Sequence, residues 1–192
     1  RYGDAPDLEE VTIEKMLTGS GVEVIDVSVG GEHACAVLSN GSVYCWGANY
    51  VGQLGNGGDV TDDFGESYIP VRVELPEDEE AVQISLGDEH SCVLTLSDEM
   101  LCWGNNDFGQ VGSGGADGGG FVNSPEYVSF GTGSNSGISH ISAGSDHTCA
   151  IKGDYGVAYC WGNYGNGQLG NGDDGGEYHY FASEVSFEWE AN

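Results

Sequence analysis

The chain has 192 residues, enough for one sizeable domain with a core of its own. Its net charge of −28 argues against binding to nucleic acid or to anionic membranes, and the absence of any run of about twenty apolar residues predicts no membrane span. With 34 glycines and 10% aromatic residues, the composition indicates a folded protein with many tight turns, and the start at Arg1 indicates a processed or excised chain.

Alternating apolar residues predict short strands from the N-terminus onward. EEVTIEKML comes first, and VEVIDVSVGG then leads into a hairpin bounded by Cys35 and Cys45. A Cys-Trp-Gly end, a glycine-rich Gly-Gln loop and the alternating stretch YIPVRVEL complete a unit of four strands. AVQISLGDE and SPEYVSF flank a second hairpin, and ISHISAGSD and SEVSFEWE flank a third.

This unit occurs three times, because the segments that begin GEHACAVL, GDEHSCVL and GSDHTCAI align throughout. We predict an N-terminal strand in residues 1–24, equivalent to the outer strand of a preceding unit, and repeats at 25–81, 82–137 and 138–192. The fourth strands are aligned on their valines, which are Val11, Val71, Val128 and Val185. Four short strands per repeat indicate an all-β fold of β-propeller blades, each with four antiparallel strands. Three such repeats would form an open arc or part of a larger propeller.

The residues also resemble a known family. Cys-Trp-Gly-x-Asn-x-x-Gly-Gln-Leu-Gly, downstream of a histidine, is similar to the regulator of chromosome condensation repeat, whose full members are seven-bladed propellers. Val111 in place of leucine and Asp98 in place of a turn glycine are the departures. The resemblance implies a propeller. Guanine-nucleotide exchange in this family depends on inserted features that we do not find, and secreted members include inhibitors that bind a target across one face.

The cysteines are expected to face each other across each hairpin. Three-residue loops fit the first two hairpins, with Gly41 and Asp98 in the left-handed position, and a four-residue loop, 153–156, fits the third. Facing residues on antiparallel strands lie within reach of a disulfide. We predict the pairs Cys35–Cys45, Cys92–Cys102 and Cys149–Cys160, and hence an extracellular or cell-surface location. A zinc site that includes His33 lacks a recurring fourth ligand, and a redox pair lacks a recurring basic neighbour.

The remaining repeated side chains are interpreted as architecture. The histidine is expected to be buried and to hydrogen-bond one blade to its neighbour, and the tryptophan is expected to lie in the core. This predicted repeat core consists of His33, His90, His147, Trp46, Trp103, Trp161, Gln53, Gln110 and Gln168.

Acidic loops follow the Gly-Gln blocks and could hold calcium, because carboxylate oxygens on flexible loops suit this ion. The candidates are Asp59, Asp62, Asp63, Asp173 and Asp174. Their spacing differs between units, so solvated loop acids are the favoured interpretation, and we predict no metal ion or other cofactor. We also predict no enzyme, since the best catalytic candidate is only Asp173–Asp174 beside Tyr178 and His179.

The expected function is that of a non-enzymatic extracellular scaffold with protein partners, which include further copies of itself. Equivalent strands at both ends of an open arc suggest head-to-tail strand addition into a ring or filament. These assembly strands carry Val11, Ile13, Val185, Phe187 and Trp189. Two alternatives stay open. The chain could be a secreted binding or inhibitor module that uses its variable loops, 56–68, 113–124 and 171–182, or a fragment of a longer seven-bladed propeller.

Overall fold

The computed structural model describes residues 21–58, 65–114, 120–131, 134–172 and 179–187. Within these ranges all regular structure is β-strand, arranged in three antiparallel sheets of four strands each. The first sheet contains β1 (Val24–Val29), β2 (His33–Leu38), β3 (Val43–Ala48) and β4 (Glu66–Arg72). The second contains β5 (Ala81–Leu86), β6 (His90–Thr95), β7 (Met100–Asn105) and β8 (Phe121–Tyr127). The third contains β9 (Ile138–Ala143), β10 (His147–Lys152), β11 (Val157–Gly162) and β12 (His179–Glu184).

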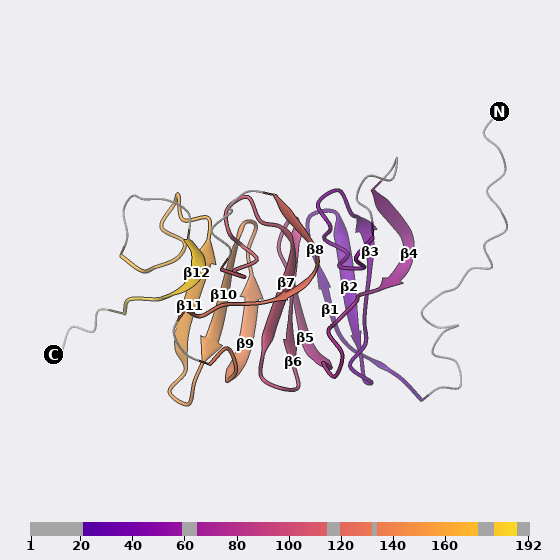
Figure 1. The fold of residues 1–192 in the computed structure, drawn as a ribbon, viewed down its shortest axis with the longest axis horizontal. Coiled ribbons are helices and arrows are strands. Elements are labelled where there is room, and N and C mark those ends of the chain that lie inside the picture. The colour runs from indigo at the N-terminus through magenta and orange to yellow at the C-terminus, as the bar shows by residue number, and fades with distance from the viewer. Residues whose placement is uncertain (1–20, 59–64, 115–119, 132–133, 173–178, 188–192) are drawn as a thin grey trace.

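The sheets stand side by side in chain order, as Figure 1 shows. Strand order within each sheet follows the sequence, so β1, β5 and β9 are the first strands of successive blades, and β4, β8 and β12 are the last. β5 contacts β1 and β2 of the first blade, and β9 contacts β5 and β6 of the second. The first and third blades do not close on each other. The predicted fold, an open arc of four-stranded propeller-type blades, is therefore confirmed.

The hydrophobic cores lie between successive blades. One core joins Val37, Leu54 and Val73 of the first blade to Ile84 and Trp103 of the second. The other core joins the second blade to the third through a second set of buried residues, which includes Leu94, Met100, Val111, Ile141 and Trp161. Because each core needs two blades, a blade is covered on both faces only when it has two neighbours.

The hairpins have the loops that the cysteine spacing predicts. Gly41 and Asp98 both have positive φ, 76° and 56°, at the last position of a three-residue loop. In the third blade Lys152 pairs with Val157, which leaves a loop of four residues between them. Gly41 also has no room for a side chain, because a Cβ there would lie 2.4 Å from Cβ of Glu80. The loop of the first blade thus contacts the start of the second.

The fourth strands differ from the prediction. They lie nearer the N-terminus than the alternating stretches suggested, so Val185 and Phe187 follow β12 rather than lie within it. The alignment of Val71 with Val128 and Val185 is also wrong. Val73 takes that place, because the N–H groups of Val73, Val128 and Val185 donate to equivalent carbonyls of the third strands. Connections of different length precede these strands, and matching valines alone does not fix the register.

Some predicted features fall outside the described residues. These are the first 20 residues with Val11 and Ile13, the calcium candidates Asp59, Asp62, Asp63, Asp173 and Asp174, and Trp189. Tyr178 is also outside, and the backbone of His179 begins β12. In the described part of the chain no helix is long and apolar enough to cross a membrane.

Candidate functional site: two open blade faces

A polar contact built from the repeated residues joins each blade to the next. His33 Nε2 lies 2.9 Å from the Ser91 hydroxyl of the second blade, and that hydroxyl donates to the Gln53 carbonyl at 2.9 Å. The Trp103 indole N–H donates to the same carbonyl at 2.8 Å. One blade thus contributes a histidine and a carbonyl, and the next contributes a hydroxyl and an indole.

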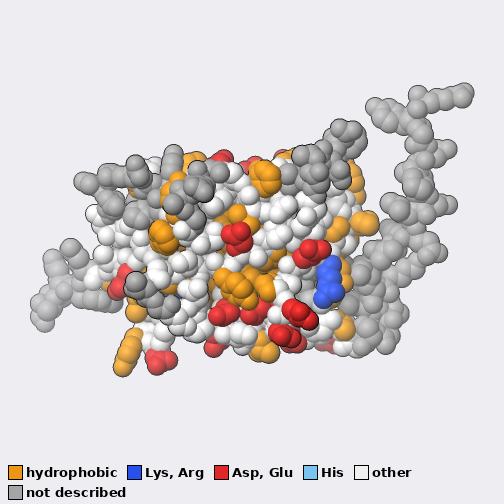
Figure 2. Space-filling view, viewed as in Figure 1, with side chains coloured by type: hydrophobic (Ala, Val, Ile, Leu, Met, Phe, Trp, Pro, Cys, Tyr) orange, Lys and Arg blue, Asp and Glu red, His pale blue; other side chains and the backbone are white. Residues whose placement is uncertain are grey.

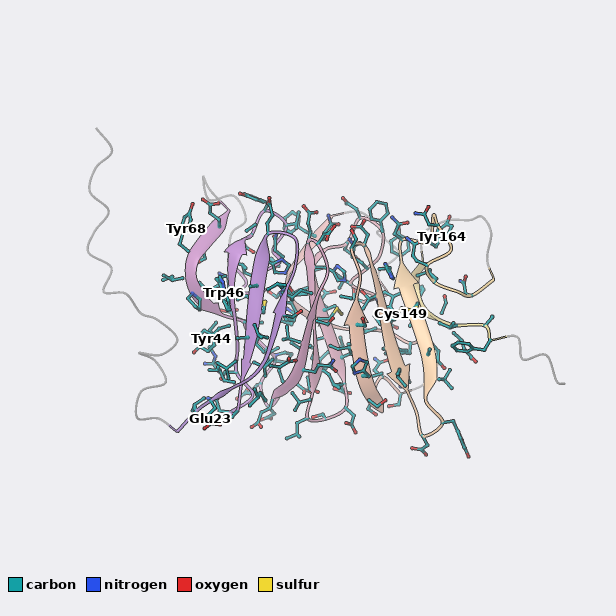
Figure 3. The ribbon with its side chains drawn as sticks, turned by 180° about the vertical axis from the view of Figure 1, so that it is seen from behind. Glu23, Tyr44, Trp46, Tyr68, Cys149 and Tyr164 are labelled. Atoms are coloured by element: carbon teal, nitrogen blue, oxygen red, sulfur yellow. A yellow bond between two sulfur atoms is a disulfide. The ribbon has the colours of Figure 1, made fainter. Side chains whose placement is uncertain are left out.

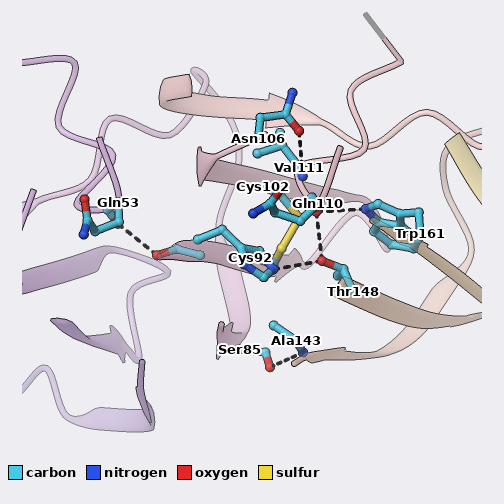
Figure 4. The surroundings of a disulfide bond; sticks show 12 residues. Gln53, Ser85, Cys92, Cys102, Asn106, Gln110, Val111, Ala143, Thr148 and Trp161 are labelled. Carbon is cyan, nitrogen blue, oxygen red and sulfur yellow. Dashed lines mark hydrogen bonds between the residues drawn. A yellow bond between two sulfur atoms is a disulfide. The ribbon is translucent and has the colours of Figure 1, made fainter. Parts of the chain in front are cut away.

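The second and third blades repeat this contact with the same geometry. His90 Nε2 lies 2.9 Å from Oγ1 of Thr148, whose hydroxyl donates to the Gln110 carbonyl at 2.8 Å. Trp161 Nε1 donates to the same carbonyl at 3.0 Å. Figure 4 shows the hydrogen bonds of Gln110 to both Thr148 and Trp161, close to the disulfide of the second blade. The contact is therefore a property of the repeat rather than of one pair of blades.

The hydroxyl fixes the tautomer of each buried histidine. Ser91 has one proton and donates it to Gln53, so His33 must donate from Nε2 and keep Nδ1 unprotonated. The Nδ1 atoms of His33 and His90 are buried and have no hydrogen-bond partner. Burial lowers the pKa of His33 to about 4. Burial, followed by the charges of His33 and His147, lowers the pKa of His90 to about 3. Both rings are thus held neutral near pH 7.

Each Gly-Gln loop is preorganised to present its carbonyl. The side-chain oxygens of Gln53, Gln110 and Gln168 each accept from a backbone N–H two residues earlier in their own loop. Glycine is required next to the indole, since a Cβ at Gly55 would lie 2.6 Å from Trp103 Nε1 and one at Gly112 would lie 2.4 Å from Trp161 Nε1. The glutamine side chain therefore closes its own loop, and the backbone carbonyl binds the neighbouring blade.

The first strands divide their side chains between two neighbours. Ser28 accepts from the Leu86 N–H at 3.1 Å, and Ser85 accepts from the Ala143 N–H at 2.9 Å, so polar side chains point to the following blade. Apolar side chains point the other way. Ile84 and Leu86 are 4% and 6% exposed against the first blade. The first strand of each blade thus presents apolar side chains to the preceding blade and hydrogen-bonding side chains to the following blade, where they lie beside the apolar core between the two blades.

The first blade leaves its apolar face open. We call the residues Val24, Val27, Val29, Ala34 and Trp46 the head face. Val27 and Val29 are 61% and 73% exposed, although they occupy the positions of Ile84 and Leu86. Trp46 is partly exposed, whereas Trp103 is fully buried. Figure 3 places Trp46 and Tyr44 in the blade at the end of the arc.

The third blade leaves its hydrogen-bonding face open. We call the residues Ser142, His147, Gln168 and Gly170 the tail face. His147 and Gln168 are partly exposed, whereas their equivalents His90 and Gln110 are fully buried. The loop is nevertheless formed, because Asn166 N–H donates to Gln168 Oε1 at 2.8 Å and Gly170 N–H donates to the Gly167 carbonyl at 3.1 Å. The tail face is an assembled copy of the contact that no blade in the described part of the chain covers.

All six cysteines are paired as their spacing predicts. Cys35–Cys45, Cys92–Cys102 and Cys149–Cys160 each join facing residues with a Cα–Cα distance of 4.1 Å. Because their sulfurs are bonded to each other, they do not offer thiolates to zinc. Nor do any three His, Cys, Asp or Glu side chains come together as metal ligands in the part of the chain that the structure describes.

Sequence reasoning missed the residue that binds the histidine. It directly follows the histidine of the next unit and is Ser91 in the second blade and Thr148 in the third. The first unit has Ala34 at this position. A comparison of the three units at that one position would have shown two hydroxyls and one methyl group. The partner of the hydroxyl, a backbone carbonyl of another blade, leaves no trace in the sequence.

An acidic groove of about 810 Å³ lies at the hairpin end of the first blade, lined by residues 40–43 and 72–80. Its carboxylates are Glu74, Glu77, Asp78, Glu79 and Glu80, and Arg72 is its one basic residue. Figure 2 shows red acidic side chains close to a small blue area at the β4 end of the molecule. This groove is separate from the head face and from the tail face.

Comparisons with known proteins agree with the repeat and its fold. The regulator of chromosome condensation (RCC1) repeat matches residues 40–94 and 97–151, and a second form of it matches 24–53, 81–110 and 138–168. The chain is 33% identical to the human E3 ubiquitin-protein ligase HERC2 over 156 residues. This match covers 80% of the chain and 3% of HERC2. The chain is also 32% identical to the ultraviolet-B receptor UVR8 of Arabidopsis thaliana over 177 residues. This match covers 90% of the chain and 37% of UVR8.

The fold is similar to that of Prp20p from Saccharomyces cerevisiae, with a TM-score of 0.73 at 23% identity over 84% of this chain and 38% of that one. The chain thus spans less than two fifths of the length of each of these proteins. By its repeats, the chain belongs to the regulator of chromosome condensation repeat family.

Proposed function

We propose that this chain is a non-enzymatic scaffold that acts through protein–protein contacts and receives further blades on its two open faces. The observation that carries the proposal is the difference in exposure between residues at equivalent positions of the end blades and the middle blade. Val27 is 61% exposed where Ile84 is 4% exposed, and the same contact that is closed twice inside the chain is open at both ends. Exposed apolar surface, as on the head face, is typical of an interaction site, and the tail face offers already formed hydrogen-bonding groups at the other end of the arc. The proposal includes no metal ion and no cofactor.

The proposed location is extracellular or at the cell surface. Three disulfides, with no free cysteine among the described residues, support an oxidising environment, since such bonds are rare where thiols are kept reduced. A thiol titration of unfolded protein from its natural source tests this part. We expect no free thiol, and six free thiols per chain would contradict an oxidising location.

The further blades come from a second copy or from another polypeptide segment. A second copy would place its head face on the tail face of the first, and repetition of this heterologous contact gives a ring or a filament. In such a contact the Trp46 indole can donate to the Gln168 carbonyl, as Trp103 donates to Gln53. This assembly uses packing of blade faces, whereas the strand addition suggested by the sequence also needs the first 20 residues, which lie outside the described ranges.

Light scattering over a range of concentrations, with negative-stain images, tests the assembly. We expect the mass to rise with concentration, and we expect Val29→Asp to prevent the rise because it places a charge on the apolar head face. Gly170→Asp is the matched change on the tail face, where a side chain would take the place of the indole. A wild-type chain that stays monomeric at high concentration would contradict self-assembly.

A second candidate function is binding of a basic protein segment in the acidic groove. Five acidic residues from 74–80 line it, and the net charge of −28 would speed the approach of such a partner. Binding of an oligolysine peptide tests this function. We expect an affinity that falls with salt and with the double change Glu77→Gln and Glu80→Gln; equal binding by that variant would exclude the groove.

A further inference from the structure

The tail face presents a hydrogen-bond donor and an acceptor of the kind that a single hydroxyl satisfies together at the two closed contacts. At both closed contacts the histidine donates from Nε2 to a hydroxyl, and the hydroxyl donates to the glutamine carbonyl. At the tail face the equivalent groups are the His147 ring and the Gln168 carbonyl. The Gln168 loop has the same internal hydrogen bond as the closed Gln110 loop, so its carbonyl is already in position.

The head face of this chain cannot supply that hydroxyl. The position of Ser91 and Thr148 is Ala34 in the first blade, on the strand that a second copy would place against His147. A methyl group there would bury the histidine N–H without a partner, which costs about five- to 150-fold in affinity. The other contacts are kept, because Trp46 retains its indole and Val29 retains its N–H for Ser142.

We propose that the tail face selects a blade with Ser or Thr at the position of Ala34, so that a second copy of this chain binds it weakly and a hydroxyl-bearing blade binds it tightly. The occupant is thus a four-stranded blade of the same repeat whose second strand carries the hydroxyl directly after its histidine. This inference rests on the proposed function, since it names the partner of one of the two open faces. Its basis is continuity with the two closed contacts inside the chain.

The test uses two forms of the full chain that can form only one contact. The first carries Val29→Asp, which blocks its head face and leaves its tail face free. The second carries Gly170→Asp, which blocks its tail face and leaves its head face free. Gly170 has a φ of 60°, which aspartate adopts more readily than most residues, and a Cβ there would lie 3.1 Å from Cγ1 of Val185, so the circular dichroism of this form is first compared with that of the wild type. Calorimetric titration of one with the other gives the affinity of a single head-to-tail contact.

Ala34→Ser in the second form should tighten binding by about tenfold or more. The same change should bring no gain when the first form also carries His147→Ala, because the donor is then missing. The matched control is Val24→Ser, which adds a hydroxyl elsewhere on the head face and should not tighten binding.

Three outcomes decide the matter. A gain that depends on His147 supports the inference. Binding of the unsubstituted pair without any gain from Ala34→Ser, or with a gain that survives His147→Ala, overturns the inference and leaves the proposed assembly intact. If no pair binds at any concentration, the two faces do not recognise each other, and both the assembly and the inference are wrong.

Discussion

The middle blade and the two end blades are built from the same unit but have different surroundings. Trp103 is fully buried and hydrogen-bonded to the first blade, whereas Trp46, at the same position of the unit, is partly exposed. His90 is fully buried, and His147 is not. The comparison teaches that burial in this fold is a property of the contact between blades. The repeated tryptophan and histidine therefore contribute their full stabilisation only where a neighbouring blade packs against them.

The largest expected difference is between Trp103→Ala and Trp46→Ala. Removal of the buried indole should lower the free energy of unfolding by about 3–5 kcal/mol, because it leaves a cavity and removes one of the two hydrogen bonds to the Gln53 carbonyl. Trp46→Ala should cost less than half as much in the monomer. Urea unfolding followed by circular dichroism measures both, and equal losses would contradict the comparison.

The disulfides sharpen the comparison because they are the same in every blade. Each disulfide spans 10 or 11 residues. If it stabilises the fold by lowering the entropy of the unfolded chain, removal of any one pair should lower the free energy of unfolding by about 2–3 kcal/mol. Paired Cys→Ala changes at Cys92–Cys102 and at Cys149–Cys160 are compared by thermal unfolding. A much larger loss in the middle blade would mean that packing, rather than loop entropy, sets the contribution.

The pH dependence of stability tests the two closed contacts between blades, which contain His33 and His90. The pKa values of His33 and His90 are lowered to about 4 and about 3, while an unfolded histidine has a pKa near 6.5. The unfolded chain therefore binds more protons than the folded chain below pH 6.5. Stability is complete above this pH and falls as the pH decreases, by about 2 kcal/mol per buried histidine at pH 5.

His90→Gln provides the control for this pH dependence. The variant lacks one titrating ring, so the loss of stability between pH 7.5 and pH 5 should be about 2 kcal/mol smaller than in the wild type. Urea unfolding at both pH values in the same salt measures the difference. An unchanged pH dependence would show that His90 is protonated equally in both states.

The smallest expected effect distinguishes the closed hydroxyl from its open counterpart. Ser91→Ala leaves the buried His33 N–H without an acceptor and should cost about 1–2 kcal/mol. Ala34→Ser adds a hydroxyl at the same position of the open blade and should change the stability of the monomer by less than about 0.5 kcal/mol. Chemical unfolding at low protein concentration, where no assembly forms, compares the two variants. A loss on Ala34→Ser as large as that on Ser91→Ala would argue against an open head face.

The sequence predicts the local structure well where the spacing of residues carries the information. The facing cysteines follow from the number of residues between them, and Gly41 and Asp98 follow from the left-handed turn that such a hairpin needs. The fourth strands were predicted less well. The alternating pattern continues past their ends, and connections of unequal length moved the matching valine from Val71 to Val73.

By itself, the sequence determined the repeat, the blade and the pairing of cysteines, because these depend on spacing within a single unit. Only the tertiary structure decided which copies of a residue are buried, since that depends on the presence of a neighbouring blade. It also decided which hydroxyl the histidine meets, because Ser91 lies 58 residues from His33 and reaches it only when two blades pack face to face. A repeated sequence specifies the contact, and the ends of the arc determine where that contact stays open.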